Sequence, residues 1–417
     1  MRRTSLALPA ASLMAATILT AAPAHAVVAE TPLGITSVTA SPGPGVGEVT
    51  VTWAQDGAYT TGYVLETALS SFSKTNPNMA LTGRHPNQLT ISGDRRSITL
   101  SAAQVSAAGA PVASGNHLYF RFYAVNTTSA GDTTTRAYPY LQAVLPRPQA
   151  PASKGTRLRI ASFNVRSARF LTDERSWLQR APDVAAEIVS QNPGIAALQE
   201  LGPGRADGQT GTLKGTARQT DSLLTALAAA KASKYKLVRS TPYVRSGSPS
   251  STQGARILYD STRYTLVSDC PNTTGKYSYS ASCSIMLPLL TTDSEGLRRR
   301  AAVAKFRNQT TLQTFFFVSA HLDHRHSTNA TTEASYDALR KRQADTIVSE
   351  VALINTAKLP VIIGGDMNSW QNNRIGNGPH DTLVAQGFYD LSAAVNRVDF
   401  QYTTMNHFRT TLPPAAQ

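Results

Sequence analysis

Short apolar runs alternate with amphipathic stretches along the chain from residue 158 onward. Strands are predicted where apolar, often β-branched residues follow one another, and helices where apolar positions recur every three or four residues. The predicted strands that matter most are Leu158–Val165, Ile195–Glu200, Phe315–Leu322 and Leu359–Gly364. The predicted helices are Ser176–Asn192, Asp221–Ala230 and Ala338–Leu353. Because strands and helices alternate, this part of the chain is predicted to be an α/β domain.

Residues 31–146 show a different pattern, in which short β-type runs are separated by Gly, Pro, Ser and Asn. These runs are Val49–Trp53, Tyr63–Thr67, Ser97–Leu100 and Leu118–Val125. Their spacing predicts a small all-β sandwich. The run Leu118–Asn126, with Trp53 upstream, resembles a fibronectin type III domain, although Leu118 stands where that family usually has a tyrosine. We expect Trp53 to lie in the core of this domain.

Residues 1–26 have the pattern of a secretory signal peptide. Arg2 and Arg3 precede an apolar stretch from Leu6 to Ala22, and Ala24-His25-Ala26 forms a small-x-small cleavage site. We therefore expect a secreted protein that begins near Val27, and the later sequence contains no segment that could span a membrane. Residues 147–156 are rich in Pro and Ala and predict an extended linker between the two domains.

The net charge of +14 is concentrated in the α/β part of the chain. Residues 27–146 hold six basic and six acidic residues, whereas residues 155–417 hold 30 basic and 20 acidic residues. This excess is expected for an enzyme that meets a polyanion or an anionic surface. It is equally typical of a secreted protein with a basic surface.

The two cysteines, Cys270 and Cys283, are separated by twelve residues. In an oxidising exterior such a pair usually forms a disulfide, and we expect one here.

Candidate catalytic side chains stand at the ends of four predicted strands. Asn164 ends the first strand, Glu200 the second and His321 the third, while Asp366 and Asn368 end the fourth. A magnesium-dependent phosphate hydrolase needs such a set. Glu200 with Asn164 nearby suffices for Mg²⁺, which takes one or two carboxylates and keeps most of its waters. His321 can bind or protonate phosphate oxygens. Asp366 and Asn368 would orient the attacking water and hold the phosphate.

Four motifs together resemble the endonuclease/exonuclease/phosphatase superfamily. They are Ser162–Val165, Leu198–Glu200, Ser319–Leu322 and Gly365–Asn368. The resemblance implies a DNase I-like four-layer α/β sandwich over residues 157–417, with Mg²⁺, or alternatively Mn²⁺ or Ca²⁺, as cofactor. It also implies that Arg299 and Arg300 reach phosphate and that Tyr259 lies beside nucleic acid.

The chain departs from this family near its C-terminus. The family has an Arg-Ile-Asp-Tyr-type strand and, a few tens of residues later, Ser-Asp-His, which supplies the main acid–base pair. Here Arg397–Phe400 resembles the first element, and Asn406-His407 resembles the second only faintly. We expect the domain to be truncated at its C-terminus and the chain to be inactive or nearly so. The alternative is that Asp399 and His407 take the place of this acid–base pair and the chain is active.

The leading interpretation is a secreted, monomeric, Mg²⁺-dependent phosphodiesterase that acts on nucleic acid. A sphingomyelinase or an inositol-phosphate phosphatase of the same fold is the first alternative. A zinc hydrolase built on the histidine-rich segment is a second, with ligands His321, Asp323, His324 and His326. A third is a truncated, non-catalytic protein that binds anions or a polymer.

Overall fold

The structure is a computed structural model that describes most of both predicted domains. It describes residues 32, 34–55, 60–68, 88–108, 118–138, 142–144, 146, 158–169, 175–243, 254–268, 278–279, 284–369 and 378–391. Several predicted features lie outside these residues, namely the signal peptide 1–26, the linker 147–156, Cys270, Cys283, Asp399 and His407. Within the described ranges, every helix is too short or too polar to span a lipid bilayer.

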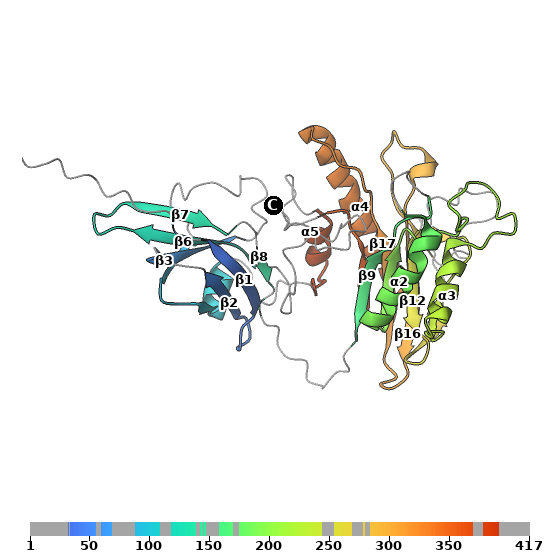
Figure 1. Cartoon of the computed structure of the whole chain (residues 1–417), viewed down its shortest axis with the longest axis horizontal. Coiled ribbons are helices and arrows are strands. Elements are labelled where there is room, and N and C mark those ends of the chain that lie inside the picture. The colour runs from blue at the N-terminus through green and yellow to red at the C-terminus, as the bar shows by residue number, and fades with distance from the viewer. Residues whose placement is uncertain are drawn as a thin grey trace, which may run out of the picture.

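The N-terminal part consists of two antiparallel sheets, as the strand pattern predicted (Figure 1). The first sheet has the order β1-β2-β5, with β1 at Ile35–Pro42, β2 at Val49–Gln55 and β5 at Ser97–Leu100. The second has the order β4-β3-β6-β7, with β8 also paired to β6. Its strands are β3 (Gly62–Ala68), β4 (Gln88–Ser92), β6 (Leu118–Thr127), β7 (Thr133–Ala137) and β8 (Gln142–Val144), and a short helix, α1 (Ala102–Ala107), follows β5.

Alternating side chains of the two sheets form the core of this part. Trp53 of β2 packs against Tyr63 of β3 and Phe122 of β6, with ring centroids 5.0 and 4.7 Å from that of Trp53. All three side chains are buried. Trp53 therefore lies in the core, as expected from the sequence.

The C-terminal part contains two more sheets that pack face to face. One has the order β11-β12-β10-β9, built from Tyr235–Leu237, Arg256–Asp260, Ile195–Gln199 and Ile160–Asn164. The other has the order β14-β15-β16-β17-β18, built from Ser278–Tyr279, Ser284–Met286, Arg300–Asn308, Thr314–His321 and Val361–Asp366, and β13 (Tyr264–Ser268) also pairs with β16. Ile195, Ala197 and Phe317 belong to the apolar core between the two sheets.

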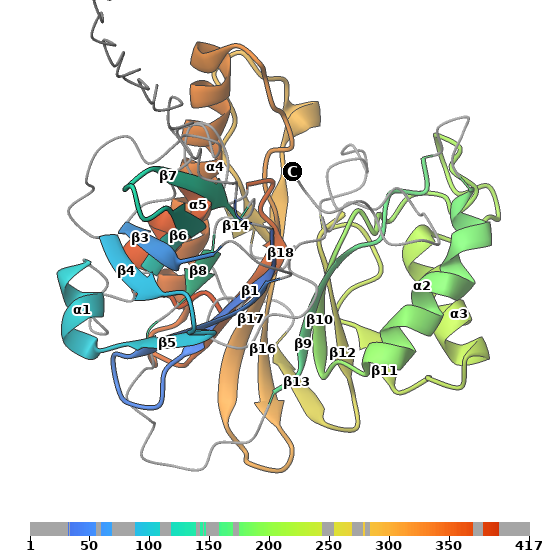
Figure 2. The same ribbon diagram turned by 60° about the vertical axis from the view of Figure 1, so that its left-hand side comes forward.

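Helices cover the outer faces of both sheets (Figure 2). They are α2 (Trp177–Gln191) and α3 (Gln219–Ala229) on one side, and α4 (Ala330–Ile354) on the other, with α5 (Gly378–Ala385) packed against α4. The short 3-10 helix η4 (Glu295–Leu297) precedes β16 and has no buried residues. Trp177 of α2 and Leu223 of α3 share a core with Leu198 of the first sheet. Ile347 of α4 shares a core with Val318 of the second sheet. The order helix, sheet, sheet, helix is the predicted four-layer α/β sandwich.

The boundaries of α2 agree with the prediction from the sequence, whereas the start of α4 does not. A capping box of Ser176 and Gln179 starts α2, and Asn192 ends it in the left-handed region with φ 45°. The predicted start of α4 at Ala338 is too late by eight residues, because α4 begins at Ala330. The Asn329 side chain caps this start by accepting hydrogen bonds from the amides of Thr331 and Thr332.

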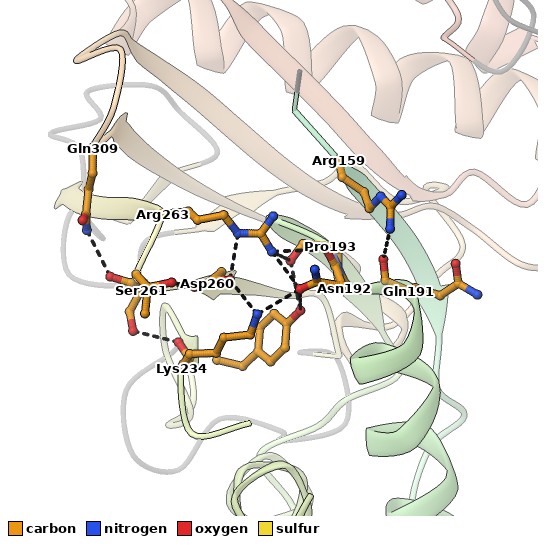
Figure 3. A network of polar contacts seen from close by, with 11 residues as sticks. Arg159, Gln191, Asn192, Pro193, Lys234, Asp260, Ser261, Arg263 and Gln309 are labelled. Atoms are coloured by element: carbon orange, nitrogen blue, oxygen red, sulfur yellow. Dashed lines mark hydrogen bonds and ion pairs between the residues drawn. The ribbon is translucent and has the colours of Figure 1, made fainter. Parts of the chain in front are cut away.

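A polar network joins the ends of α2, β11 and β12 (Figure 3). Asp260, whose side chain is 1% exposed, accepts hydrogen bonds from Arg263 Nε at 2.8 Å and from Lys234 Nζ at 3.0 Å. Both cations also donate to the side chain of Asn192, and Arg263 donates to the Pro193 carbonyl. The Asp260 amide donates to the Gly194 carbonyl, just before β10. The network therefore fixes the amino-terminal end of β10, opposite the end from which Glu200 follows.

Candidate active site

The four predicted strand ends meet at one edge of the two facing sheets. Strands β9 and β10 are parallel with Asn164 opposite Gln199, so Glu200 emerges beside Asn164. Strands β17 and β18 are parallel with His321 opposite Asp366. The carboxyl ends of parallel neighbours lie at the same edge of a sheet, so the topology brings these residues together.

Glycines let the two sheets approach closely just before this edge. A Cβ atom on Gly364 would lie 3.2 Å from Cβ of Ala197 in the facing sheet, and one on Gly365 would lie 2.3 Å from the Ala320 carbonyl oxygen. The Ser319 hydroxyl donates to the Leu198 carbonyl of the other sheet at 3.3 Å. The two glycines before Asp366 therefore let β18 approach both neighbours.

The Asn164 side chain joins the two sheets at the site. Its amide nitrogen donates to Glu200 Oε1 at 3.1 Å and to Asp366 Oδ2 at 3.0 Å. Its Oδ1 accepts from the Arg166 amide at 3.0 Å and keeps a second lone pair. The Glu200 and Asp366 side chains are 22% and 31% exposed, so solvent or a ligand can reach this group of three.

Glu200 is held in an unusual backbone conformation. Its φ of 58° lies in the left-handed region, and a Cβ atom on Gly254 would lie 2.8 Å from its Cα atom. Its Oε2 accepts from the Ser167 amide at 2.9 Å. Burial disfavours the carboxylate, but the hydrogen bonds from Ser167 and Asn164 outweigh it, and the pKa of Glu200 lies below its usual value. Glu200 is therefore an anion at neutral pH.

Arg299 determines the tautomer and the protonation state of His321. Its Nη1 lies 3.2 Å from His321 Nδ1, and because a guanidinium only donates, Nδ1 must be the acceptor. The proton of the neutral ring is thus on Nε2, which lies 3.9 Å from Asp366 Oδ2. Burial, followed by the charge of Arg299, lowers the pKa of His321 to about 3. At neutral pH the ring is uncharged and presents an N–H group beside Asp366.

Asn368 closes the turn after β18. It has a left-handed φ of 47°, and its amide donates to Asp366 Oδ1 at 3.0 Å. Its side-chain nitrogen donates to the Leu322 carbonyl at 3.0 Å. These contacts hold Asp366 beside β17, and the expected role of Asn368 toward the attacking water and the phosphate stays a prediction.

His324 belongs to this group and was considered in the sequence only as a zinc ligand. Arg299 Nη2 lies 2.7 Å from its Nδ1, so Arg299 donates to both His321 and His324. The feature of the sequence that pointed to His324 was the dense segment His-Leu-Asp-His. Burial, then the charge of Arg299, lowers the pKa of His324 as well.

Two expected substrate contacts are corrected by their positions. Arg300 is buried in β16 with 5% exposure, and its guanidinium donates to the Ser284 hydroxyl of β15 at 2.9 Å, so the sheet covers it. Tyr259 lies opposite Ile195, at the amino-terminal end of β10, because β12 runs antiparallel to β10. Its ring packs against Phe306 between the sheets. Neither position suits a contact with a substrate at the strand ends.

The donor set at the strand ends fits a hard cation. Glu200 and Asn164 offer oxygen atoms, with the Asp366 carboxylate next to them, and Mg²⁺ uses one or two carboxylates and completes its shell with water. Within the described ranges, no group of three or more His, Cys, Asp or Glu side chains is placed to hold a metal ion. The alternative zinc site around His321 and Asp323 is therefore not formed.

Comparison with known proteins identifies a family for this domain. The model of the endonuclease/exonuclease/phosphatase family matches residues 161–414. No curated protein matches the chain.

Several solved structures are similar to the chain at low identity. An endonuclease/exonuclease/phosphatase from Bacteroides vulgatus is 19% identical over 56% of this chain and 73% of its own, with a TM-score of 0.39. A mannosyl-6-phosphatase from Bacteroides thetaiotaomicron is 19% identical over 55% and 71%, with a TM-score of 0.38. Staphylococcus aureus beta toxin is 14% identical over 56% and 73%, with a TM-score of 0.39. These similarities are too distant to assign a substrate.

Proposed function

Because the chain belongs to the endonuclease/exonuclease/phosphatase family, whose members hydrolyse phosphoesters, we propose that it is a secreted, Mg²⁺-dependent phosphodiesterase that acts on nucleic acid. One observation carries the proposal: the Asn164 amide donates to Glu200 in one sheet and to Asp366 in the other. This places an anionic oxygen cluster beside His321 and Arg299, which are suited to an anionic substrate.

Glu200 and Asn164 are the residues that would hold the cation. Glu200 is ionised at neutral pH, and the Ser167 amide and the Asn164 side chain fix its two oxygens. When bound, Mg²⁺ neutralises charge on the phosphoryl oxygens and makes phosphorus more open to attack by water. Mn²⁺ and Ca²⁺ are the alternatives that the same oxygen donors would accept.

Asp366 is the group that would orient the attacking water. Its Oδ1 is fixed by the Asn368 amide, and its Oδ2 accepts from Asn164. The 3.9 Å between Oδ2 and His321 Nε2 is too long for a direct hydrogen bond, so a water or substrate oxygen can bridge the two atoms. A carboxylate in this position can accept a proton from the nucleophile.

His321 and Arg299 would stabilise the phosphate. The neutral His321 ring presents Nε2–H to a phosphoryl oxygen, and Arg299 adds a positive charge next to it. Both groups are held in place before substrate binds, because Arg299 also contacts His324. Such preorganised donors act where negative charge develops during hydrolysis.

The choice of nucleic acid as substrate is supported by charge. Residues 155–417 hold ten more basic than acidic residues, which favours a polyanion. Sphingomyelin, which is also a phosphodiester, and inositol phosphates, which are phosphomonoesters, remain the alternatives that the experiment must separate.

A panel of phosphate esters tests the proposal. The full chain is incubated with DNA, RNA, bis-nitrophenyl phosphate, sphingomyelin and inositol phosphates, with Mg²⁺ or with a chelator. We expect a slow, Mg²⁺-dependent cleavage of nucleic acid that Asp366→Asn lowers by roughly 10²–10⁴-fold. Asp183→Asn, a change of the same kind on the exposed face of α2, should leave the rate unchanged. Metal-independent cleavage, or equal rates for the two variants, would refute the proposal.

A further inference from the structure

Gln219 contacts both loops that carry the proposed metal ligands. It is the first residue of α3 and is 2% exposed. Its Oε1 accepts from the Gly202 amide at 2.9 Å, and its Nε2 donates to the Arg166 carbonyl at 3.0 Å. Arg166 is two residues beyond Asn164, and Gly202 is two residues beyond Glu200.

The backbone of both loops is strained, so contacts from other parts of the domain must hold it. Arg166 has φ 62° and Glu200 has φ 58°, and both are non-glycine residues in the left-handed region. Such conformations are unfavourable for residues with a side chain and persist only where surrounding contacts hold them. The contacts of Gln219 lie next to both strained positions.

The loop after Asn164 is also anchored from α2. Arg180, buried at 3% exposure, donates to the carbonyls of Val165 at 2.7 Å and Ser167 at 3.0 Å. Ser167 then donates its own amide to Glu200. Arg180 therefore fixes the first loop, while Gln219 joins that loop to the second.

We propose that Gln219 is a positioning residue that sets the separation of Asn164 and Glu200 and so determines the affinity of the site for its divalent cation. This inference rests on the proposed function of the same site. A side-chain amide is suited to the task because it offers one acceptor and one donor in a fixed geometry, matching an N–H group on one loop and a C=O group on the other.

Gln219→Met removes both contacts at nearly constant volume. The Gly202 amide and the Arg166 carbonyl then lose their buried partner, and the loops can relax apart. Residues that orient metal ligands typically contribute 10–100-fold to affinity, so we expect binding of Mn²⁺ to weaken by about 10-fold or more.

Thr220→Val is the matched control. Thr220 is the next residue of α3, is fully buried, and donates to the Ser240 carbonyl at 2.8 Å, in a loop that holds no proposed ligand. Its loss should lower stability without changing metal affinity. A second variant, Gln219→Asn, keeps both polar groups but is too short to reach both loops, and we expect it to weaken binding in the same way.

Mn²⁺ is titrated into the full chain and each variant, and the free ion is measured by electron paramagnetic resonance at a temperature where all of them are folded. Weaker binding by both Gln219 variants, with Thr220→Val unchanged, is expected. Unchanged affinity of the Gln219 variants, or an equal loss in Thr220→Val, would overturn the role of Gln219. Absence of saturable binding to the unaltered chain would contradict the proposed function itself, and with it this role.

Discussion

At the scale of single residues, one guanidinium group determines the tautomers of two histidines. Arg299 donates to Nδ1 of His321 and of His324, which leaves the ring protons on Nε2. The sequence predicted that Arg299 reaches phosphate but not that it contacts either histidine. That contact arises because β16 runs antiparallel to β17, which brings residue 299 beside the end of β17. Strand direction and register are not visible in a single sequence.

The variant Arg299→Lys tests whether the hydrolysis rate depends on the positive charge of Arg299 alone or also on its two hydrogen bonds. The lysine keeps a positive charge but has no planar fork, so it cannot donate to both histidines at once. A hydrogen bond to a charged group contributes about 1.5–3 kcal/mol, so we expect the hydrolysis rate to fall by about 10- to 100-fold. Steady-state kinetics measures this loss, with Lys305→Arg as a control in the same sheet. A rate for Arg299→Lys equal to that of the unaltered chain would show that charge alone suffices.

At the scale of elements, the strand ends were predictable and their surroundings were not. Buried strands appear in the sequence as apolar runs, so Asn164, Glu200, His321 and Asp366 could be placed at their ends. The hydrogen bond from Asn164 to Asp366 joins residues 202 positions apart, and only the packing of the two sheets creates it. Tyr259 was misplaced for the same reason, since the direction of β12 decides which end of the sheet it occupies.

The Asp260 network predicts how the domain responds to acid. Burial alone would raise the pKa of Asp260, but hydrogen bonds from Thr262, Lys234 and Arg263 lower it to about 2. A carboxyl group whose pKa is depressed on folding stabilises the fold above its unfolded value of about 3.9, and that contribution is lost as the pH falls towards 2. Asp260→Asn should therefore lower the free energy of unfolding by about 2 kcal/mol at pH 7.

Denaturant unfolding at several pH values checks this prediction. The difference between the unaltered chain and Asp260→Asn should shrink between about pH 4 and pH 2. Asp183→Asn, which removes an exposed ion pair with Arg175, should change stability by no more than about 1 kcal/mol at any pH. A difference for Asp260→Asn that stays constant with pH would contradict the assignment of charge to this carboxylate.

At the scale of the whole molecule, the chain has separate cores. The N-terminal core draws its residues from Ile35 to Val144, and the three cores of the α/β part draw theirs from residue 158 onward. The change from alternating β patterns to mixed strand and helix patterns predicted this division. The resemblance of the first part to a fibronectin type III domain stays a prediction.

Separate cores should unfold in separate transitions. Trp53→Ala removes a buried ring from the N-terminal core and should destabilise that domain by about 3–5 kcal/mol. We expect calorimetry to show one transition moving to lower temperature while the other stays in place. Added Mg²⁺ should raise only the transition temperature of the α/β domain, because a ligand stabilises the domain that binds it. A common shift of both transitions would show that the domains unfold together.

The most direct test of the account is the Mg²⁺ dependence of phosphodiester hydrolysis by the unaltered chain, Glu200→Gln and Glu187→Gln. Glu187 is an exposed glutamate of α2, so its substitution makes the same chemical change away from the site. Removal of the Glu200 charge should shift half-maximal activity to a Mg²⁺ concentration at least about 10-fold higher, whereas Glu187→Gln should follow the unaltered chain. If Glu200→Gln keeps the same Mg²⁺ curve as Glu187→Gln, the strand ends do not form the metal-dependent site.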